Sequence, residues 1–172
     1  TTWDGSNISS GNGAKFVNDA TGIFNAGDGG ISHSGGSRAT FTNSGRFNKN
    51  SGSGSNVIDT VFENSGTVSV TSGKLKLAQG ATNADNSKLE VGAGAELELN
   101  GDVSLTAKTE LKGGGKARFL GLTLLANALI DIANFDFDGG TLNGSNGFSG
   151  LVNWNDGNWN SAGHTTIAHG GV

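Results

Sequence analysis

The chain has 172 residues, enough for one domain of ordinary size, and contains 31 Gly but no Pro, Cys, Met or Tyr. The lack of Cys excludes disulfides and thiolate metal sites, and a net charge of −4 with only 11 Lys and Arg argues against a nucleic-acid partner. No run approaches the ~20 apolar residues of a membrane span, because the longest apolar stretch, residues 120–132, is broken by Gly121, Asn127 and Asp131.

Residues 1–13 open the chain as a Gly- and Ser-rich segment with one Trp. There is no signal peptide and no initial Met, so we expect a processed chain or an excerpt of a longer one. We interpret residues 1–13 as an N-terminal cap or edge segment of a single β-solenoid domain over residues 1–172, with Trp3 as an end plug.

One motif recurs between residues 14 and 66. Residues 16–18 read Phe-Val-Asn, and the pattern returns as Phe-Thr-Asn-Ser-Gly at 41–45 and Phe-Glu-Asn-Ser-Gly at 62–66. Stacked on successive coils, these copies predict two internal ladders. The aromatic ladder consists of Phe16, Phe41 and Phe62, and the amide ladder consists of Asn18, Asn43 and Asn64.

Short segments from residue 68 to residue 137 alternate apolar and polar residues at period two, as strands with one buried face do. They are separated by Gly, Asn and Ser, which form tight corners. In this half the spacing settles at 22 residues: Leu75, Leu97 and Phe119 recur at that interval. The same spacing aligns Trp154 with Ile132 and Trp159 with Phe137.

Charged residues follow the same interval and alternate in sign. Lys74, Glu96 and Arg118 are 22 residues apart, and Lys76 and Glu98 share that spacing. If 22 residues make one coil, these side chains stack on neighbouring rungs ~4.8 Å apart. We therefore predict that Lys74, Glu96 and Arg118 form one outer column that helps to fix the register.

Together these patterns predict an all-β fold, a right-handed parallel β-helix of about seven to eight coils with 21–22 residues per coil. Residues 14–164 would form the repeat coils and residues 165–172 a C-terminal edge. Buried positions are expected at Phe41, Phe62, Leu75, Leu97, Phe119, Ile132 and Trp154.

The Phe-x-Asn-Ser-Gly motif, residues 72–77 (Ser-Gly-Lys-Leu-Lys-Leu) and residues 152–159 (Val-Asn-Trp-Asn-Asp-Gly-Asn-Trp) resemble β-solenoid repeat regions of large bacterial extracellular proteins. Such regions form stalks of adhesins and autotransporter-like surface proteins within the pectin-lyase-like β-helix architecture. The resemblance covers roughly residues 14–170 and implies a rigid surface or fibre module. A fold alone does not assign an activity.

The resemblance also raises the possibility of a catalytic or metal site, because pectin-lyase-like helices include polysaccharide lyases and hydrolases, which use acidic clusters on neighbouring coils. The best acidic cluster is Asp131, Asp136 and Asp138, and no acidic residue lies 22 positions from any of them. We interpret the three as solvated surface residues. His33, His164 and His169 lack an evident third ligand for zinc and are interpreted as surface or corner residues.

The sequence offers three further alternatives: sugar stacking, ice binding and N-glycosylation. Trp154 and Trp159 could stack on sugars, but their spacing favours a widened final coil filled by two indoles. Thr does not recur at a constant register, which argues against ice binding. The N-glycosylation patterns at Asn7 and Asn143 are interpreted as chance in so Asn-rich a chain.

Functionally, the sequence favours a structural, non-enzymatic module with no cofactor or metal, located outside the cell or on its surface. It would serve as an adhesin stalk segment or as a fibre subunit. The alternative is a carbohydrate-binding or carbohydrate-cleaving β-helix, with a surface glycan as partner. The expected assembly ends are Trp3, Thr165 and Ile167, because terminal coils expose unpaired backbone groups that can template another strand. Head-to-tail stacking through these ends would grow a filament.

Overall fold

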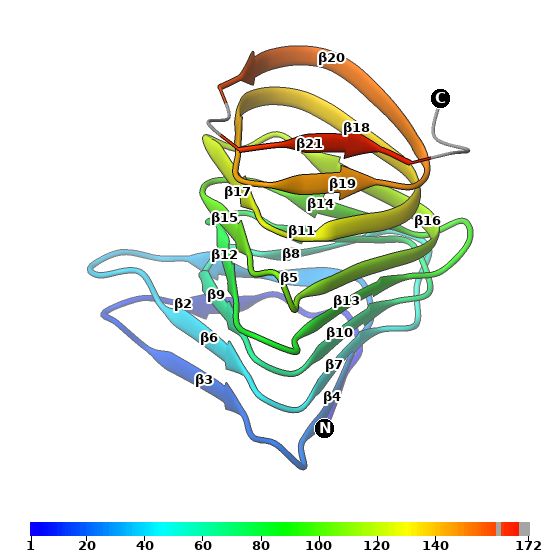
Figure 1. The fold of residues 1–172 in the computed structure, drawn as a ribbon. Coiled ribbons are helices and arrows are strands. Elements are labelled where there is room, and N and C mark those ends of the chain that lie inside the picture. The colour runs from blue at the N-terminus through cyan, green and yellow to red at the C-terminus, as the bar shows by residue number, and fades with distance from the viewer. Residues whose placement is uncertain (161–162, 169–172) are drawn as a thin grey trace.

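The computed structural model describes residues 1–160 and 163–168. These residues form 21 β-strands, all paired in parallel, in a β-solenoid of about eight turns (Figure 1). Within this described part there is no helix, and hence none that could cross a membrane. The predicted all-β solenoid of stacked coils is confirmed.

Three flat faces, here called A, B and C, are defined by which strands pair. Face A contains β1 (Thr2–Trp3), β4 (Ile23–Ala26), β7 (Arg46–Lys49), β10 (Thr67–Val70), β13 (Lys88–Val91), β19 (Asn146–Phe148) and β21 (Thr165–Ile167). Face B contains β2 (Ile8–Ser10), β5 (Gly29–His33), β8 (Ser55–Ile58), β11 (Lys74–Leu77) and β14 (Glu96–Leu99). Face C contains β3 (Lys15–Asn18), β6 (Thr40–Asn43), β9 (Val61–Asn64), β12 (Ala81–Asn83), β15 (Val103–Leu105) and β17 (Thr123–Ala126).

Three longer strands bend around corners and join the faces. They are β16 (Glu110–Phe119), β18 (Leu129–Asn143) and β20 (Leu151–Trp159). In Figure 1, β3, β6 and β9 stack on one flank and β4, β7, β10 and β13 on the other. Because β1 and β2 pair with β4 and β5, the segment 1–13 supplies strands to the first coil.

The alternation of the sequence becomes an inside and an outside in most strands. In β11, for example, Leu75 and Leu77 are buried in the core, whereas Lys74 and Lys76 line the outer surface. Of the seven predicted core residues, Phe41, Phe62, Leu75, Leu97, Phe119 and Ile132 are buried. The prediction is wrong for Trp154, which is only partly buried because it lies in β20, near the C-terminal end of the rod. Backbone pairing with the coils above and below lets strands of only three or four residues persist.

The coils shorten along the rod, so the uniform length of 21–22 residues holds only in its middle. Register partners are 25 residues apart at Asn18 and Asn43, 22 apart at Lys74 and Glu96, and 17 apart at Asp136 and Asn153. The expected widened final coil is therefore wrong, because the last coil is among the shortest.

A tighter corner between faces A and B shifts the predicted register by two residues. Five residues, 91–95, separate Glu90 from Glu96, whereas only three, 113–115, separate their register partners Lys112 and Lys116. Phe119 consequently pairs with Leu99 and not with Leu97. Glycine makes this turn because a Cβ on Gly115 would lie 2.3 Å from the carbonyl oxygen of Gly92.

Close approach between neighbouring coils also explains the Gly of the early Asn-Ser-Gly motif. Gly45 and Gly66 stack at the corner between faces C and A, where the amide of Gly66 donates to the carbonyl of Asn43. A Cβ on Gly66 would lie 2.1 Å from the carbonyl oxygen of Gly45, so any side chain would force the coils apart.

Candidate functional site

The predicted aromatic ladder is present inside the first coils. The rings of Phe16 and Phe41 stack with centroids 5.9 Å apart, and those of Phe41 and Phe62 stack at 5.3 Å. A second stack of Phe24 and Phe47, on face A, meets the first edge-on, with 5.5 Å between the centroids of Phe41 and Phe47. The sequence contained this second column at Ile23-Phe24-Asn25 and Arg46-Phe47-Asn48, a repeat of 23 residues.

The amide ladder is also present and is one residue longer than predicted. The Nδ2 of Asn18 donates to Oδ1 of Asn43 (2.7 Å), which in turn donates to Asn64 (2.9 Å), which donates to Asn83 (3.1 Å). All four side chains are buried at the corner that ends face C. Asn83 was missed because it lies 19 residues after Asn64, in a coil without the Phe motif.

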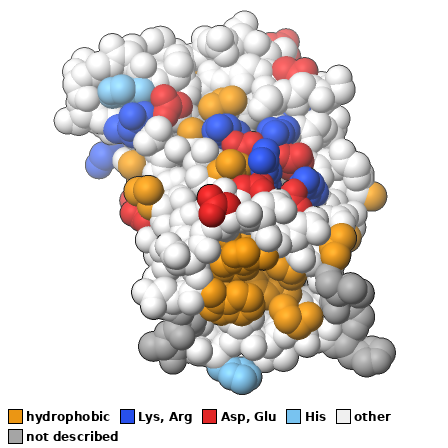
Figure 2. All heavy atoms as spheres, turned by 90° about the horizontal axis from the view of Figure 1, so that it is seen from above, with side chains coloured by type: hydrophobic (Ala, Val, Ile, Leu, Met, Phe, Trp, Pro, Cys, Tyr) orange, Lys and Arg blue, Asp and Glu red, His pale blue; other side chains and the backbone are white. Residues whose placement is uncertain are grey.

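A dense network of ion pairs covers face B. Lys74 Nζ lies 2.9 Å from Glu96 and 3.1 Å from Glu98, and Lys76 Nζ lies 2.8 Å from Glu98. Further along the rod, Lys116 pairs with Asp136 and Arg118 pairs with Asp138. In Figure 2, basic and acidic side chains lie side by side, above the apolar patch in that view.

The charged column differs from the prediction in its third member. Lys74 and Glu96 are register partners as expected, but Glu96 is followed by Lys116, and Arg118 follows Glu98. The cause is the two-residue shortening at residues 113–115. Basic and acidic residues still alternate along both outer columns, because Lys116 and Arg118 are both basic.

Glu98 is the most enclosed acid of this network. Burial by itself raises the pKa of the Glu98 carboxyl, and hydrogen bonds from Lys76 and Lys74 outweigh it, so the pKa lies below its ordinary value of 4.5. For Asp138, burial likewise raises the pKa, while Arg118 and Asn155 bring it below 3.8. Both carboxyls therefore favour folding when ionised: their contribution is complete above these ordinary values and is lost as the pH falls through the lowered ones.

Replacing Glu98 with Gln is expected to lower the free energy of unfolding by about 1–2 kcal/mol at pH 7, since two charge-assisted hydrogen bonds to partly exposed lysines are lost. The difference from wild type should shrink at pH 3, on the acid side of the ordinary value of 4.5, because the contribution of Glu98 falls as the pH drops toward its lowered pKa. Urea unfolding followed by circular dichroism at both pH values measures this. Glu63→Gln, on exposed face C, is the matched control. An equal loss at both pH values would contradict the assignment.

The fold places Asp131 on a different face from Asp136 and Asp138, which stay two residues apart in β18, and the interpretation of all three as solvated surface residues is wrong for Asp136. Asp136 lies on the outward side of β18 but is buried, where it pairs with Lys116 and accepts a hydrogen bond from Asn153 (2.8 Å). Asp131 is on face A, where Ser149 donates to it, and Asp138 pairs with Arg118. The expectation of no stacked acidic neighbour is wrong for Asp138, because Asp156 is its register partner in the shortened coil.

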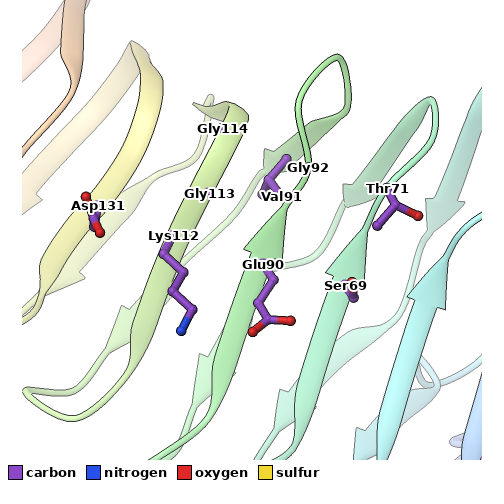
Figure 3. Close-up of a pocket in the computed structure, with 9 residues that line it drawn as sticks. All are labelled: Ser69, Thr71, Glu90, Val91, Gly92, Lys112, Gly113, Gly114 and Asp131. Atoms are coloured by element: carbon purple, nitrogen blue, oxygen red, sulfur yellow. The ribbon is translucent and has the colours of Figure 1, made fainter.

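Open hollows surround Asp131 and Lys112 on face A. The hollow in Figure 3 has a volume of about 450 Å³ and lies over β10, β13, β16 and β18. In that view Lys112 extends between Glu90 and Asp131, and Ser69 and Thr71 form the far side. Two further hollows adjoin it and share Asp131. The floor offers carboxylate, ammonium and hydroxyl groups but no aromatic ring.

The histidines and hydroxyl residues do not assemble into sites. His33 is half-buried in face B and His164 is exposed near the C-terminal end, while His169 lies outside the described residues. Across residues 1–160 and 163–168, no group of three or more His, Asp or Glu could hold a metal ion. On face C the outward column passes from Thr42 through Glu63 to Thr82, so no regular Thr array forms.

Lys49 occupies a position that sequence alternation assigns to an apolar residue. Its side chain is fully buried at the end of β7, between Ala26 and Val70 in register. Its ammonium group donates to Asp28 Oδ1 (3.0 Å), to the carbonyl of Gly52 (3.1 Å) and to that of Ser51. Lys49 thus fixes the long corner at residues 50–54 from within.

The two ends of the rod differ in how their tryptophan side chains pack. Trp3 is only 8% exposed, packs edge-on against Phe24 (6.0 Å) and donates from Nε1 to the carbonyl of Ser6 (2.6 Å), so its indole covers the apolar interior of the first coil. At the other end, Trp154 stacks on Phe137 (4.2 Å) and Trp159 stacks on Trp154 (5.0 Å). The predicted alignment was wrong: Trp154 pairs with Phe137 and Trp159 with Leu142, because the last coil is short.

Comparisons with protein-family models, with curated proteins and with solved structures found no match to this chain.

Proposed function

We propose that this chain is a structural module, a rigid β-solenoid segment that acts outside the cell or on its surface as a stalk or as a unit of a fibre. The observation that carries this proposal is the distribution of its polar groups. Buried amides pair with one another along the rod axis, and the charged side chains of face B pair across neighbouring coils. Polar groups that pair across neighbouring coils stiffen the rod and fix the register of its strands.

The ladders support the same proposal because they run along the axis of the rod. Stacked Phe rings and the Asn chain connect each of the first coils to the next, so bending would separate several contacts at once. The resemblance of the Phe-x-Asn-Ser-Gly motif to the repeat regions of bacterial surface proteins supports an extracellular location.

A carbohydrate-binding role is the second candidate, and the hollow around Asp131 favours it. Carboxylates, a lysine and hydroxyls in a depression of about 450 Å³ can form hydrogen bonds to sugar hydroxyls. Lys112 lies 2.5 Å from Glu110, Ser149 donates to Asp131, and the floor has no aromatic ring to stack on a sugar. These features favour the structural role.

The structural proposal predicts a stiff particle without activity on glycans. Small-angle scattering of the purified chain should give an elongated, rigid particle, and incubation with neutral and acidic polysaccharides should release no reducing or unsaturated ends. Titration with oligosaccharides, read by chemical shifts at Asp131, should show no saturable binding. Sugar release that disappears in Asp136→Ala, or saturable binding that disappears in Asp131→Asn, would overturn the proposal in favour of the carbohydrate role.

A further inference from the structure

The C-terminal end exposes side chains at positions that are core positions everywhere else. Trp159 and Ile167 are register partners of the buried Leu142 and Phe148, yet they are 51% and 48% exposed. Trp154, the partner of buried Phe137, is half-buried. Figure 2, which looks onto this end, shows apolar side chains gathered in one patch. The patch continues the hydrophobic core at the last described coil.

The patch is also ordered by contacts of its own. The two indoles stack at an interplanar angle of 17°, and Nε1 of Trp159 donates to Oγ1 of Thr165 across the coil, which links β20 to β21. This hydrogen bond holds the outer indole in place over the core. A fixed aromatic surface loses little side-chain entropy when it becomes covered, which is a property of strong protein contact sites.

The N-terminal end is a poor complement to this patch. Coils there span 25 residues between Asn18 and Asn43, whereas register partners near the C-terminal end are 17 residues apart. A wide cross-section laid on a narrow one would leave part of its core uncovered. The N-terminal end is moreover closed by Trp3, which is 8% exposed. Head-to-tail stacking therefore has mismatched surfaces.

We propose that the partner of this patch is a second copy of the chain, joined through its own C-terminal end. Two identical ends match in width, and a two-fold axis places the same aromatic patch on both sides of the contact. Residues 151–160 include one charged side chain, Asp156, so little repulsion opposes the contact. Among the described strands, β21 pairs only with β19 and β20 only with β18, so each has an edge available.

The two-fold axis also fixes how these edges meet. Coils that face each other end to end circulate in opposite senses when seen from one side, so the terminal strands run antiparallel. Antiparallel ladders are slightly more stable per residue than parallel ones. The assembly closes at two copies, giving a rod of doubled length with both N-terminal ends outward. It deepens the proposed structural role and rests on it, replacing an open filament with a closed dimer.

Analytical ultracentrifugation over a range of concentrations tests the contact. Wild-type chain should sediment as a monomer–dimer equilibrium, and Trp159→Lys combined with Ile167→Lys should raise the dissociation constant at least about 100-fold, the size of a central contact residue. Ile23→Lys, an exposed apolar residue of the first coils, is the matched control and should leave the constant unchanged. Circular dichroism of each variant verifies that it is folded.

Spin labels determine which ends meet, since the chain has no Cys of its own. A label at Thr166→Cys, beside the patch, should give short inter-label distances in the dimer, and a label at Val17→Cys, in β3, the first strand of face C, should not. Oligomers that grow without limit, or a wild-type chain that stays monomeric at millimolar concentration, would overturn the proposal. A monomeric rod that is stiff and inert toward glycans would still leave the structural role standing.

Discussion

Replacing Phe62 with alanine is expected to lower the free energy of unfolding by about 3–5 kcal/mol. The ring is fully buried, stacks on Phe41 at 5.3 Å and meets Phe47 edge-on at 5.9 Å. Its register partner on the next coil is Ala81, which is too small to fill the space that the ring leaves. Because the backbone on both sides is fixed by pairing, the cavity cannot collapse easily, and the cost should approach the upper part of this range.

Chemical unfolding followed by circular dichroism measures this loss. Val61→Ala is the matched control: Val61 is adjacent in β9 but points outward and is 39% exposed, so its truncation should cost less than about 1 kcal/mol. A loss below about 1 kcal/mol for Phe62→Ala as well would mean that the aromatic ladder does not carry the stability of these coils.

The second large effect is expected for Asn43→Asp, with a loss of about 3–5 kcal/mol at pH 7, the cost of an uncompensated buried charge. Asn43 is fully buried, accepts from Asn18, and donates to Asn64 (2.9 Å) and to the carbonyl of Thr67 (3.2 Å). An ionised carboxylate can still accept the hydrogen bond from Asn18. It cannot donate to Asn64 or to the carbonyl of Thr67, and would face both of these acceptors without a proton. The isosteric change therefore isolates the donor role of the amide.

This variant should also depend on pH in a way that wild type does not. The introduced carboxyl has a raised pKa in the folded state, because its charged form is buried without donors from Asn64 or Thr67. Its least destabilising form is protonated, so the loss should be smallest near pH 4 and grow as the pH rises. Asn48→Asp, at a half-buried outward position of β7, is the control and should show a small loss at every pH. A loss independent of pH would show that shape alone matters at this site.

The ladders were predictable because they depend on side chains at strand positions that repeat locally. Phe16, Phe41 and Phe62 each precede an Asn by two residues, and in a strand that spacing puts both side chains on the same, inward face. The prediction tolerated intervals of 25 and 21 residues, because the motif itself marked the register. The coil that contains Asn83 lacks the Phe motif, so the place of Asn83 in the amide ladder was not predicted.

Register in the second half could not be predicted in full, because corners can lose residues without disturbing the strands on either side. The shortening at residues 113–115 leaves the alternation of β16 unchanged, so Arg118 and Phe119 still looked aligned with Glu96 and Leu97 at an interval of 22. Only the backbone pairs of the fold show that they lie beside Glu98 and Leu99. The same effect moved both C-terminal tryptophans by several positions.

The sequence by itself determined that this chain coils, which side chains face inward, and which residues form the first ladders, because alternation and steric limits on corners act within a few residues. The tertiary structure alone decided the taper of the rod, the burial of Lys49 and the contrast between a plugged and an open end. Each of these depends on how one coil lies on the next. A buried ammonium, for instance, is stable only where a neighbouring corner brings carbonyl and carboxylate oxygens to it, and no local pattern records that arrangement.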